Sequence, residues 1–252
     1  MKPGFTALGH PSSIEIGQTH GVFVLDDSAG LIRNDYDLPL EARKLQQAAC
    51  VKFLHKPNAA SMTSQGAVIT TRAGSFVYTD SAYFFDHATA VKLLDMFRKI
   101  SPLSCEIDAY GDFLQALGPN ANRDYTGNTA NVSTVEKDLV AVREAIFHHL
   151  KGTPLNVLVF NNSEFHHIGT IDEFLEHYSA RSPLFQELGA QFTTLGASKA
   201  PAAKLTAAGT LLATSMTTLF ADYDSVTLGA NCVLEYCSIG AHTQIGEGCI
   251  LR

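Results

Sequence analysis

The sequence predicts an α/β chain in two parts, a sheet-and-helix domain followed by the start of a parallel β-helix. The first part is predicted because short apolar runs, typical of buried strands, alternate with segments that carry helix-capping residues. Strands that alternate with helices favour a sheet covered on both faces. The second part is predicted because aliphatic residues near the C-terminus recur every five or six positions, as in a hexapeptide-repeat β-helix.

Four short apolar segments are expected as strands. They are residues 22–25, 51–54, 83–85 and 155–160. Residues 26–47 are polar with mixed charge, so we expect a surface excursion there. Residues 58–75 are rich in small and polar side chains, which predicts a loop with one edge strand.

Four further segments are expected as helices: 87–100, 107–117, 133–150 and 170–178. Asp86 is of a residue type that caps a helix N-terminus, and Gly118-Pro119 ends the second helix. Ser133 and Thr170 each have a Glu three residues later, the capping-box pattern. The first helix carries its apolar residues on one broad face, namely Val91, Leu94, Met96 and Phe97.

The C-terminal tail carries the aliphatic period at Leu228, Leu234, Ile239, Ile245 and Leu251, and three of these precede glycine. In such a repeat each short strand points one aliphatic side chain inward and small residues form the turns. A solenoid needs several repeats to bury its core, so this stretch predicts an unfinished β-helix. The expected organisation is therefore a domain over 1–188, an Ala/Thr/Gly/Ser-rich connection over 189–221 and the start of a β-helix over 222–252.

Composition argues against several function classes. The net charge is −7, the pI is near 5.8 and no basic run occurs, which argues against a nucleic-acid surface. No apolar run reaches the ~20 residues that span a membrane, and the N-terminus has no apolar signal region. The five cysteines form no CxxC pair. A cytoplasmic protein with reduced thiols and without a membrane partner is expected, and the oligomeric state stays open.

Four motifs occur in a fixed order: Thr19-His20-Gly21-Val22-Phe23-Val24-Leu25-Asp26, Leu54-His55-Lys56-Pro57, and the segments 79–86 and 165–175. With the aliphatic repeats they resemble the later half of the sugar nucleotidyltransferase fold. A closer resemblance is to the L-fucose-1-phosphate guanylyltransferase family, which also occurs fused to an L-fucokinase. The most specific part of this resemblance is the segment 105–119. The segments His10-Pro11-Ser12-Ser13 and Tyr78-Thr79-Asp80-Ser81 also resemble the family.

The resemblance implies a partial, Rossmann-like nucleotidyltransferase domain followed by a truncated left-handed parallel β-helix. It also implies an activity, in which L-fucose 1-phosphate attacks the α-phosphate of GTP to give GDP-L-fucose and pyrophosphate with Mg²⁺. Catalysis of this kind rests mainly on positioning and charge neutralisation. The family's Gly-rich nucleotide loop is absent from the sequence. We therefore expect a fragment without the guanine and triphosphate site, and no Mg²⁺ ligand is identified in it.

Two alternatives remain open at the level of the whole chain. One is a non-catalytic fragment or pseudoenzyme that binds a sugar nucleotide. The other is a hexapeptide-repeat acyltransferase, which needs many more coils and usually a catalytic histidine within them. His242 is the one candidate histidine for that role in the repeat region.

Lys56 and His167 are the expected catalytic residues, by resemblance. Lys56 matches the family lysine that contacts the sugar phosphate, and a flexible ammonium suits a phosphate, although a surface lysine before a turn gives the same local pattern. His167 stands where the wider family has a metal-binding Asp. Imidazole is a poor Mg²⁺ ligand, so either that metal contact is lost or His167 contacts phosphate. Zinc held by His148, His149, His166 and His167 is a further alternative.

Five residues are expected to bind the substrate: Gly21, His55, Asp80, Glu106 and Asp108. Glycine at position 21 lets the backbone approach a sugar ring, although a plain turn glycine fits the pattern too. His55 replaces the family's usual Glu, which fits a changed sugar. The acidic cluster around Asp108 could bind sugar hydroxyls or a metal, or form a solvated face, and Asp112 lies one helical turn beyond Asp108.

Overall fold

The computed structural model describes residues 2–28, 30–72, 74–129, 132, 134–178, 184, 187, 211–213, 218–219, 227–230, 232–235 and 237–252. The chain divides into two compact units, Met1–Phe165 and His166–Arg252, and each is described by itself. The predicted domain boundary at 188 and 189 lies outside the described residues. So does the predicted connection over 189–221, except for two short strands.

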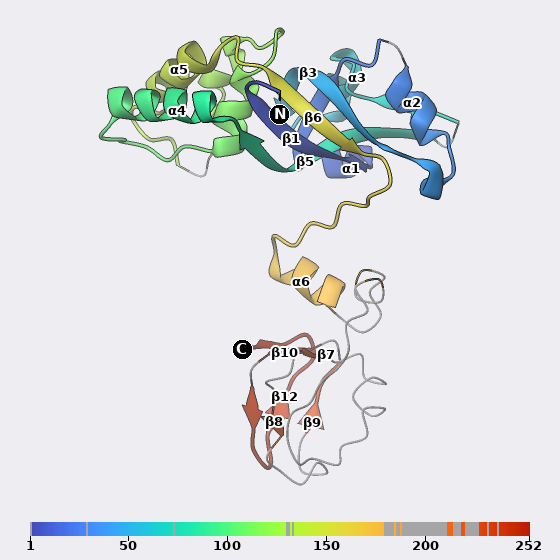
Figure 1. The fold of residues 1–252 in the computed structure, drawn as a ribbon. Helices are drawn as coiled ribbons and strands as arrows, with labels where there is room; N and C mark the ends of the chain where they lie inside the picture. Colours follow the sequence, from blue (N-terminus) through green and yellow to red (C-terminus); the bar gives the residue numbers. More distant parts are fainter. Residues whose placement is uncertain are drawn as a thin grey trace. The chain divides into compact units, whose positions relative to one another are not determined.

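The first unit is built on six strands (Figure 1). They are β1 (Phe5–Ser12), β2 (Gly21–Leu25), β3 (Leu45–His55), β4 (Ile69–Thr71), β5 (Gly74–Phe85) and β6 (Leu155–Phe160). Their order in the sheet is β1-β6-β3-β2-β5-β4, and β1 also pairs with β5. Five strands therefore close into a barrel, and β4 extends it as an extra strand on β5.

The mixed α/β class is confirmed, but the expected open, Rossmann-like sheet is wrong for this unit. Among the strand pairs of its described residues, only β1 and β6 run parallel; the others are antiparallel. Parallel neighbours need a crossover of a dozen or more residues, usually a helix. The chain offers few such crossovers: β4 ends at Thr71 and β5 begins at Gly74, a hairpin spacing.

In the described part of the first unit, the α-helices that flank the barrel are α1 (Ile14–Gly17), α2 (Leu31–Tyr36), α3 (Ala59–Ser64), α4 (His87–Ile100) and α5 (Leu139–Leu150). In Figure 1, α4 and α5 lie together beside the barrel, on the side away from α2 and α3. The helix predicted after Asp86 is confirmed, since Oδ1 of Asp86 accepts a 2.8 Å hydrogen bond from the N–H of Thr89. The predicted surface excursion and the predicted loop contain α2 and α3 respectively, so both are more regular than expected.

Helix α5 begins at Leu139, later than the capping-box pattern predicts. The Glu136 carboxylate is used elsewhere, because its Oε2 accepts a 2.6 Å hydrogen bond from the backbone N–H of Glu106. Ser133 lies outside the described residues. Glu136 therefore bonds to the distant Glu106 in place of the backbone at the predicted helix start.

Residues 107–117 do not form the single α-helix that was expected. A π-helix at Ala109–Phe113 runs into a 3-10 turn at Leu114–Ala116. The carboxylates of Asp108 and Asp112 accept hydrogen bonds from nearby backbone N–H groups, 2.9 Å each, and such bonds compete with a regular helical ladder. The predicted stop at Gly118 is confirmed: its φ is +83°, and a Cβ there would lie 2.8 Å from the carbonyl oxygen of Cys50.

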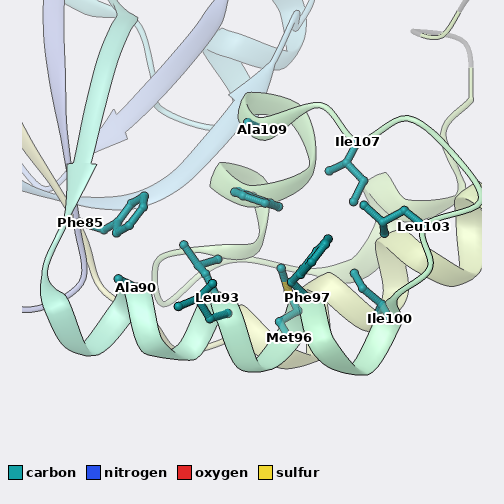
Figure 2. Close-up of a pocket in the computed structure, with 11 residues that line it drawn as sticks. Phe85, Ala90, Leu93, Met96, Phe97, Ile100, Leu103, Ile107 and Ala109 are labelled. Carbon is teal, nitrogen blue, oxygen red and sulfur yellow. The ribbon is translucent and has the colours of Figure 1, made fainter.

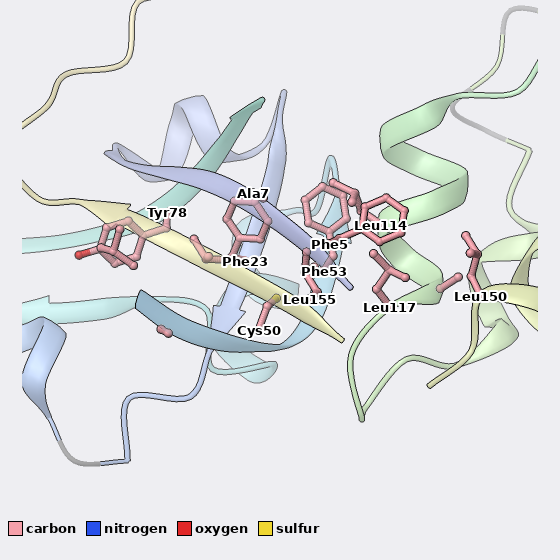
Figure 3. Close-up of a cluster of buried hydrophobic side chains, with 14 of the residues drawn as sticks. Phe5, Ala7, Phe23, Cys50, Phe53, Tyr78, Leu114, Leu117, Leu150 and Leu155 are labelled. Carbon is pink, nitrogen blue, oxygen red and sulfur yellow. The ribbon is translucent and has the colours of Figure 1, made fainter. Parts of the chain in front are cut away.

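The main core fills the barrel and continues beside it (Figure 3). Strand β6 alternates as expected for a strand with one buried face, and Leu155, Val157 and Val159 are at most 2% exposed. They belong to one cluster with Phe5, Phe23, Phe53, Tyr78, Leu114, Leu117 and Leu150. A second cluster holds Val22, Val24, Leu54, Met62 and Val77, so both faces of β2 are buried.

The apolar face predicted on α4 is only partly core. Met96 is buried, but Val91, Leu94 and Phe97 are each more than half exposed. None of the described helices is long and apolar enough to cross a membrane.

In the second unit, helix α6 (Ile171–Tyr178) begins at the predicted capping box. Oε2 of Glu173 accepts a hydrogen bond from the N–H of Thr170 (2.9 Å), and the Thr170 hydroxyl accepts one from the N–H of Glu173 (3.2 Å). Helix α6 packs through Phe174, Leu175 and Tyr178 against Val233. The predicted capping box is confirmed. It was predictable because Thr170 and Glu173 lie three residues apart in the sequence.

The rest of the described second unit consists of very short strands: β7 (Leu211–Ala213), β8 (Thr218–Leu219), β9 (Thr227–Leu228), β10 (Val233–Glu235), β11 (Ser238–Ile239), β12 (Gln244–Ile245) and β13 (Ile250–Leu251). All pairs described among them are parallel: β10 with β7 and β13, β11 with β8, and β12 with β9. Leu234, Ile239 and Ile245 are buried, whereas Leu251 is 39% exposed. The side chain of Leu228 lies outside the described residues.

Candidate functional site

Five of the seven predicted site residues gather where β2 begins and β3 ends. We call this place the barrel corner; it comprises Gly21, His55, Lys56, Asp80 and Asp108. The strand register brings the first four together. Gly21 of β2 pairs with His55 of β3, which Lys56 follows. Val22 of β2 pairs with Thr79 of β5, which Asp80 follows. Asp108 reaches the corner from the segment before the π-helix, where it contacts His55.

Gly21 and Asp80 form the tightest contact of the barrel corner. The N–H of Gly21 donates a 2.9 Å hydrogen bond to Oδ1 of Asp80. A Cβ at position 21 would strike the ring of Phe53 and lie 2.8 Å from the same carboxylate oxygen. Burial raises the pKa of the Asp80 carboxyl, and the hydrogen bond from Gly21 opposes that rise. Glycine is therefore required here for packing, whatever binds at the corner.

His55 faces Asp108 across the corner, with its Nε2 3.4 Å from Oδ2 of Asp108. The His55 side chain is only 8% exposed, and its Nδ1 is buried without a hydrogen-bond partner among the described residues. Burial lowers the pKa of His55; the Asp108 charge opposes this, while the charges of Lys56 and Arg143 reinforce it. The ring is therefore neutral at neutral pH, and the carboxylate favours the tautomer with the proton on Nε2.

Lys56 is exposed and adopts φ +46°, in the left-handed region. Its N–H donates a 3.0 Å hydrogen bond to the carbonyl of His20, and the buried Pro57 follows it. A non-glycine residue held in this region costs of order 1–3 kcal/mol, and such residues cluster at ligand sites. The backbone thus holds an exposed ammonium beside His55 at an energetic cost.

Behind Asp108 lies a buried ion pair that the sequence did not reveal as part of a site. Nε of Arg143 is 2.7 Å from Oδ1 of Asp112, and the two side chains are 2% and 1% exposed. Burial raises the pKa of the Asp112 carboxyl, and the Arg143 charge opposes that rise. The available signal was a single arginine in the apolar run Leu139-Val140-Ala141-Val142-Arg143-Glu144-Ala145-Ile146-Phe147.

Asp108 and Arg143 also line a polar hollow of about 620 Å³. Glu106, the sixth predicted site residue, lines it with them, as do Thr134 and Glu136. The polar side chains of this lining are three carboxylates, the Thr134 hydroxyl and the Arg143 guanidinium. The excess of carboxylates suits a ligand with hydroxyl groups better than an anion.

A second hollow, of about 550 Å³, lies between α4 and the segment 103–113 (Figure 2). Its lining side chains are all apolar: Phe85, Ala90, Leu93, Leu94, Met96, Phe97, Ile100, Leu103, Ile107, Ala109 and Phe113. A sugar phosphate would find no polar partner there, so this hollow does not compete with the barrel corner as the candidate site.

His167, the seventh predicted site residue, belongs to the second unit. It is exposed, and its Nδ1 lies 2.9 Å from Oε1 of Glu173. This hydrogen bond and one from the N–H of Gly169 lower the pKa of Glu173 to about 2. His167 therefore helps to hold the start of α6, and a role at phosphate stays a prediction.

The residues of the first unit do not form a ready-made Mg²⁺ site. Across its described part, no three carboxylate, imidazole or thiol groups approach closely enough to hold a metal ion. The Asp80 and Asp108 carboxylates already accept hydrogen bonds from backbone N–H groups. For the zinc alternative, His149 is already bonded through Nε2 to the carbonyl of Lys92 (2.8 Å).

Comparison with known proteins covers the whole chain. Residues 1–252 match the family model described as the fucose pyrophosphorylase domain. Two curated relatives are named fucose-1-phosphate guanylyltransferase: the one from Mus musculus is 43% identical over 268 residues, and the one from Homo sapiens is 44% identical over 269. Both alignments cover 99% of this chain but only 43% and 42% of the relatives. The chain thus spans about two fifths of the length of these relatives.

Proposed function

Because the chain belongs to the fucose pyrophosphorylase family, we propose that it is part of a nucleotidyltransferase that forms GDP-L-fucose and pyrophosphate from GTP and L-fucose 1-phosphate. The barrel corner is its sugar-phosphate site. The observation that carries this proposal is the convergence of separate motifs: Gly21 bonds to Asp80, and His55 contacts Asp108.

In the proposed reaction a phosphate oxygen of L-fucose 1-phosphate forms a bond to the α-phosphorus of GTP. The bond from that phosphorus to the bridging oxygen breaks, and pyrophosphate leaves. Two anions have to approach each other, so the protein contributes position and positive charge. The exposed ammonium of Lys56 supplies charge at the sugar phosphate, while Asp80 and Asp108 at the corner and Glu106 in the polar hollow suit the sugar hydroxyls.

Mg²⁺ belongs to the proposal through the family resemblance, and no residue of this chain is assigned to it. His167 is kept as a second phosphate contact on the same ground. Because its Nδ1 already bonds to Glu173, we expect its replacement to affect turnover less than replacement of Lys56.

For residues 222–252 we propose a parallel β-helix of hexapeptide repeats. Two observations support it. The described strand pairs of the second unit are all parallel, and three residues of the aliphatic period, Leu234, Ile239 and Ile245, are buried.

The test of the site is Lys56→Asn. Asparagine tolerates the left-handed backbone at this position, so the variant keeps the fold while removing the ammonium. In the complete protein, pyrophosphate release with GTP, Mg²⁺ and L-fucose 1-phosphate should fall at least tenfold. The affinity of this chain for L-fucose 1-phosphate should fall by a similar factor. The matched control is Lys52→Asn on β3, whose ammonium bonds to Gln65 and whose loss should change neither. Equal activity of Lys56→Asn and the wild type would contradict the assigned role.

A non-catalytic sugar-nucleotide-binding chain is the second candidate, favoured by the absence of a Gly-rich nucleotide loop from this sequence. It predicts that L-fucose 1-phosphate or GDP-L-fucose binds while no pyrophosphate is released. Turnover by this chain alone would reject it.

A further inference from the structure

The buried pair of Arg143 and Asp112 needs an explanation beyond packing. Taking two charges out of water costs several kcal/mol per ion, and apolar residues of similar volume often serve a core equally well. The neighbouring inward residues of α5, Leu139, Ile146 and Leu150, are apolar. An arginine among them, paired at 2.7 Å and bonded through NH1 to the carbonyl of Asn128, indicates a task that an apolar side chain cannot perform.

The pair holds Asp108 by its backbone. Oδ2 of Asp112 accepts a 2.9 Å hydrogen bond from the N–H of Asp108, and the N–H of Asp112 donates a 2.7 Å hydrogen bond to the carbonyl of Asp108. One residue thus fixes both polar groups of the Asp108 main chain. Nε of Arg143 lies 2.7 Å from the other oxygen of Asp112, and the ionic attraction between them favours this orientation of the carboxylate.

The side chain of Asp108 is oriented from a second direction. Its Oδ1 accepts a 2.9 Å hydrogen bond from the N–H of Tyr110, which leaves Oδ2 facing Nε2 of His55. A Cβ at Gly111 would lie 2.9 Å from that oxygen and 3.4 Å from Cε1 of His55. Gly111 therefore leaves the room in which Asp108 and His55 meet.

Asp108 combines this fixed position with access to a ligand. Its side chain is 42% exposed and lines the polar hollow. An acceptor held in place before binding loses little freedom on contact with a ligand hydroxyl, which improves affinity.

We propose that Asp112 and Arg143 are positioning residues of the sugar site, which fix the Asp108 carboxylate where it meets both His55 and a sugar hydroxyl. This inference rests on the proposed function for the sugar itself. It assigns the pair to binding of the sugar ring and not to the phosphate, which Lys56 contacts.

The test uses the full chain with both charges of the pair removed, Asp112→Asn with Arg143→Met. Removal of both partners avoids leaving one buried charge unpaired, and a thermal scan confirms folding. L-fucose 1-phosphate should bind about tenfold more weakly by calorimetry, while inorganic phosphate binds as in the wild type. The matched control removes an exposed pair of α4, Asp95→Asn with Lys99→Met, and should change neither affinity.

A second readout needs no ligand. This readout uses the single variant Asp112→Asn, which keeps Arg143, because loss of the Arg143 charge would by itself raise the pKa of His55. The Asp108 charge opposes the lowering of that pKa, so a displaced Asp108 should lower it further, toward its value in Asp108→Asn. NMR titration of the His55 ring measures this shift.

The outcomes separate the two proposals. An unchanged pKa of His55 in Asp112→Asn, together with unchanged sugar-phosphate affinity in the folded double variant, overturns the positioning role. Failure of the wild-type chain to bind L-fucose 1-phosphate overturns the proposed function, while the His55 titration still decides whether the pair positions Asp108. Equal weakening for inorganic phosphate overturns the assignment to the sugar ring.

Discussion

At the residue scale, the barrel corner holds an imidazole whose charge depends on its neighbours. His55 faces Asp108, which lies in the segment before the π-helix. The charges of Lys56, just after β3, and of Arg143 on α5 also act on the His55 ring. Burial outweighs the single favourable carboxylate, so the corner has a neutral ring beside a carboxylate and an ammonium. This arrangement offers both an acceptor and a cation to a sugar phosphate.

The pKa of His55 should therefore lie below the ordinary value of 6.5. We expect Asp108→Asn to lower it further and Lys56→Asn to raise it, because these changes remove a favourable and an unfavourable charge respectively. Since the unfolded chain then binds the proton more readily than the folded chain, His55 makes the fold less stable as the pH falls below about 6.5. NMR titration of the ring checks the three values; a wild-type pKa at or above 6.5 would contradict the assigned environment.

The sequence identified the corner residues that sit inside motifs, Gly21, His55 and Lys56, because their local patterns resemble those of a family. Arg143 was missed for a physical reason. Its partner Asp112 lies in a different segment, and no spacing in the sequence reveals that α5 packs against the π-helix.

At the element scale, the segment after Lys56 depends on a cap. Oδ1 of Asn58 accepts a 2.8 Å hydrogen bond from the N–H of Ser61 at the start of α3. Helix α3 contributes the fully buried Met62 to the second core cluster. The cap thereby connects the left-handed backbone at Lys56 to packing against the outer face of the barrel.

Asn58→Ala should lower the free energy of unfolding by about 1 kcal/mol, measured by chemical denaturation. Asn58→Ser keeps an oxygen that can accept the same hydrogen bond and should recover most of the loss. If the alanine and serine variants are equally unstable, the side-chain cap is not what stabilises α3.

Elements with local signals were predictable and those with distant partners were not. Strands β2 and β6 and helices α4 and α6 follow from apolar runs and caps within a few residues. Strand β1 was missed because Gly9 and Pro11 interrupt its pattern. The start of α5 was misplaced because Glu136 bonds to Glu106, thirty positions away.

At the scale of the whole first unit, closure of the barrel depends on β6, which lies between β1 and β3. Closure also depends on the pairing of β1 with β5, whose partners lie 65 to 80 positions apart, from Ser12 with Val77 to Phe5 with Phe85. No local pattern encodes such a pairing, which explains why an open sheet was expected. The apolar run of β6 predicted a strand from the sequence, but which strands flank it was not predictable.

Leu155→Ala should lower the global free energy of unfolding by about 2–5 kcal/mol, because it opens a cavity in the barrel core. Leu155 is 2% exposed, whereas Leu158 on the same strand is only partly buried. Leu158→Ala is therefore the matched control and should cost clearly less by chemical denaturation. Equal losses would mean that β6 does not present its odd-numbered residues to a closed core.

The place of β6 in the sheet has a consequence for biosynthesis. As the chain leaves the ribosome, β1 to β5 emerge well before residues 155–160, and the slot between β1 and β3 stays empty in the meantime. Two strand edges with unpaired N–H and C=O groups are then open to other chains. Strand β1 is paired on both sides only after β6 has been synthesised. The time needed to translate the segment with α4 and α5, between β5 and β6, therefore sets how long those edges remain unpaired.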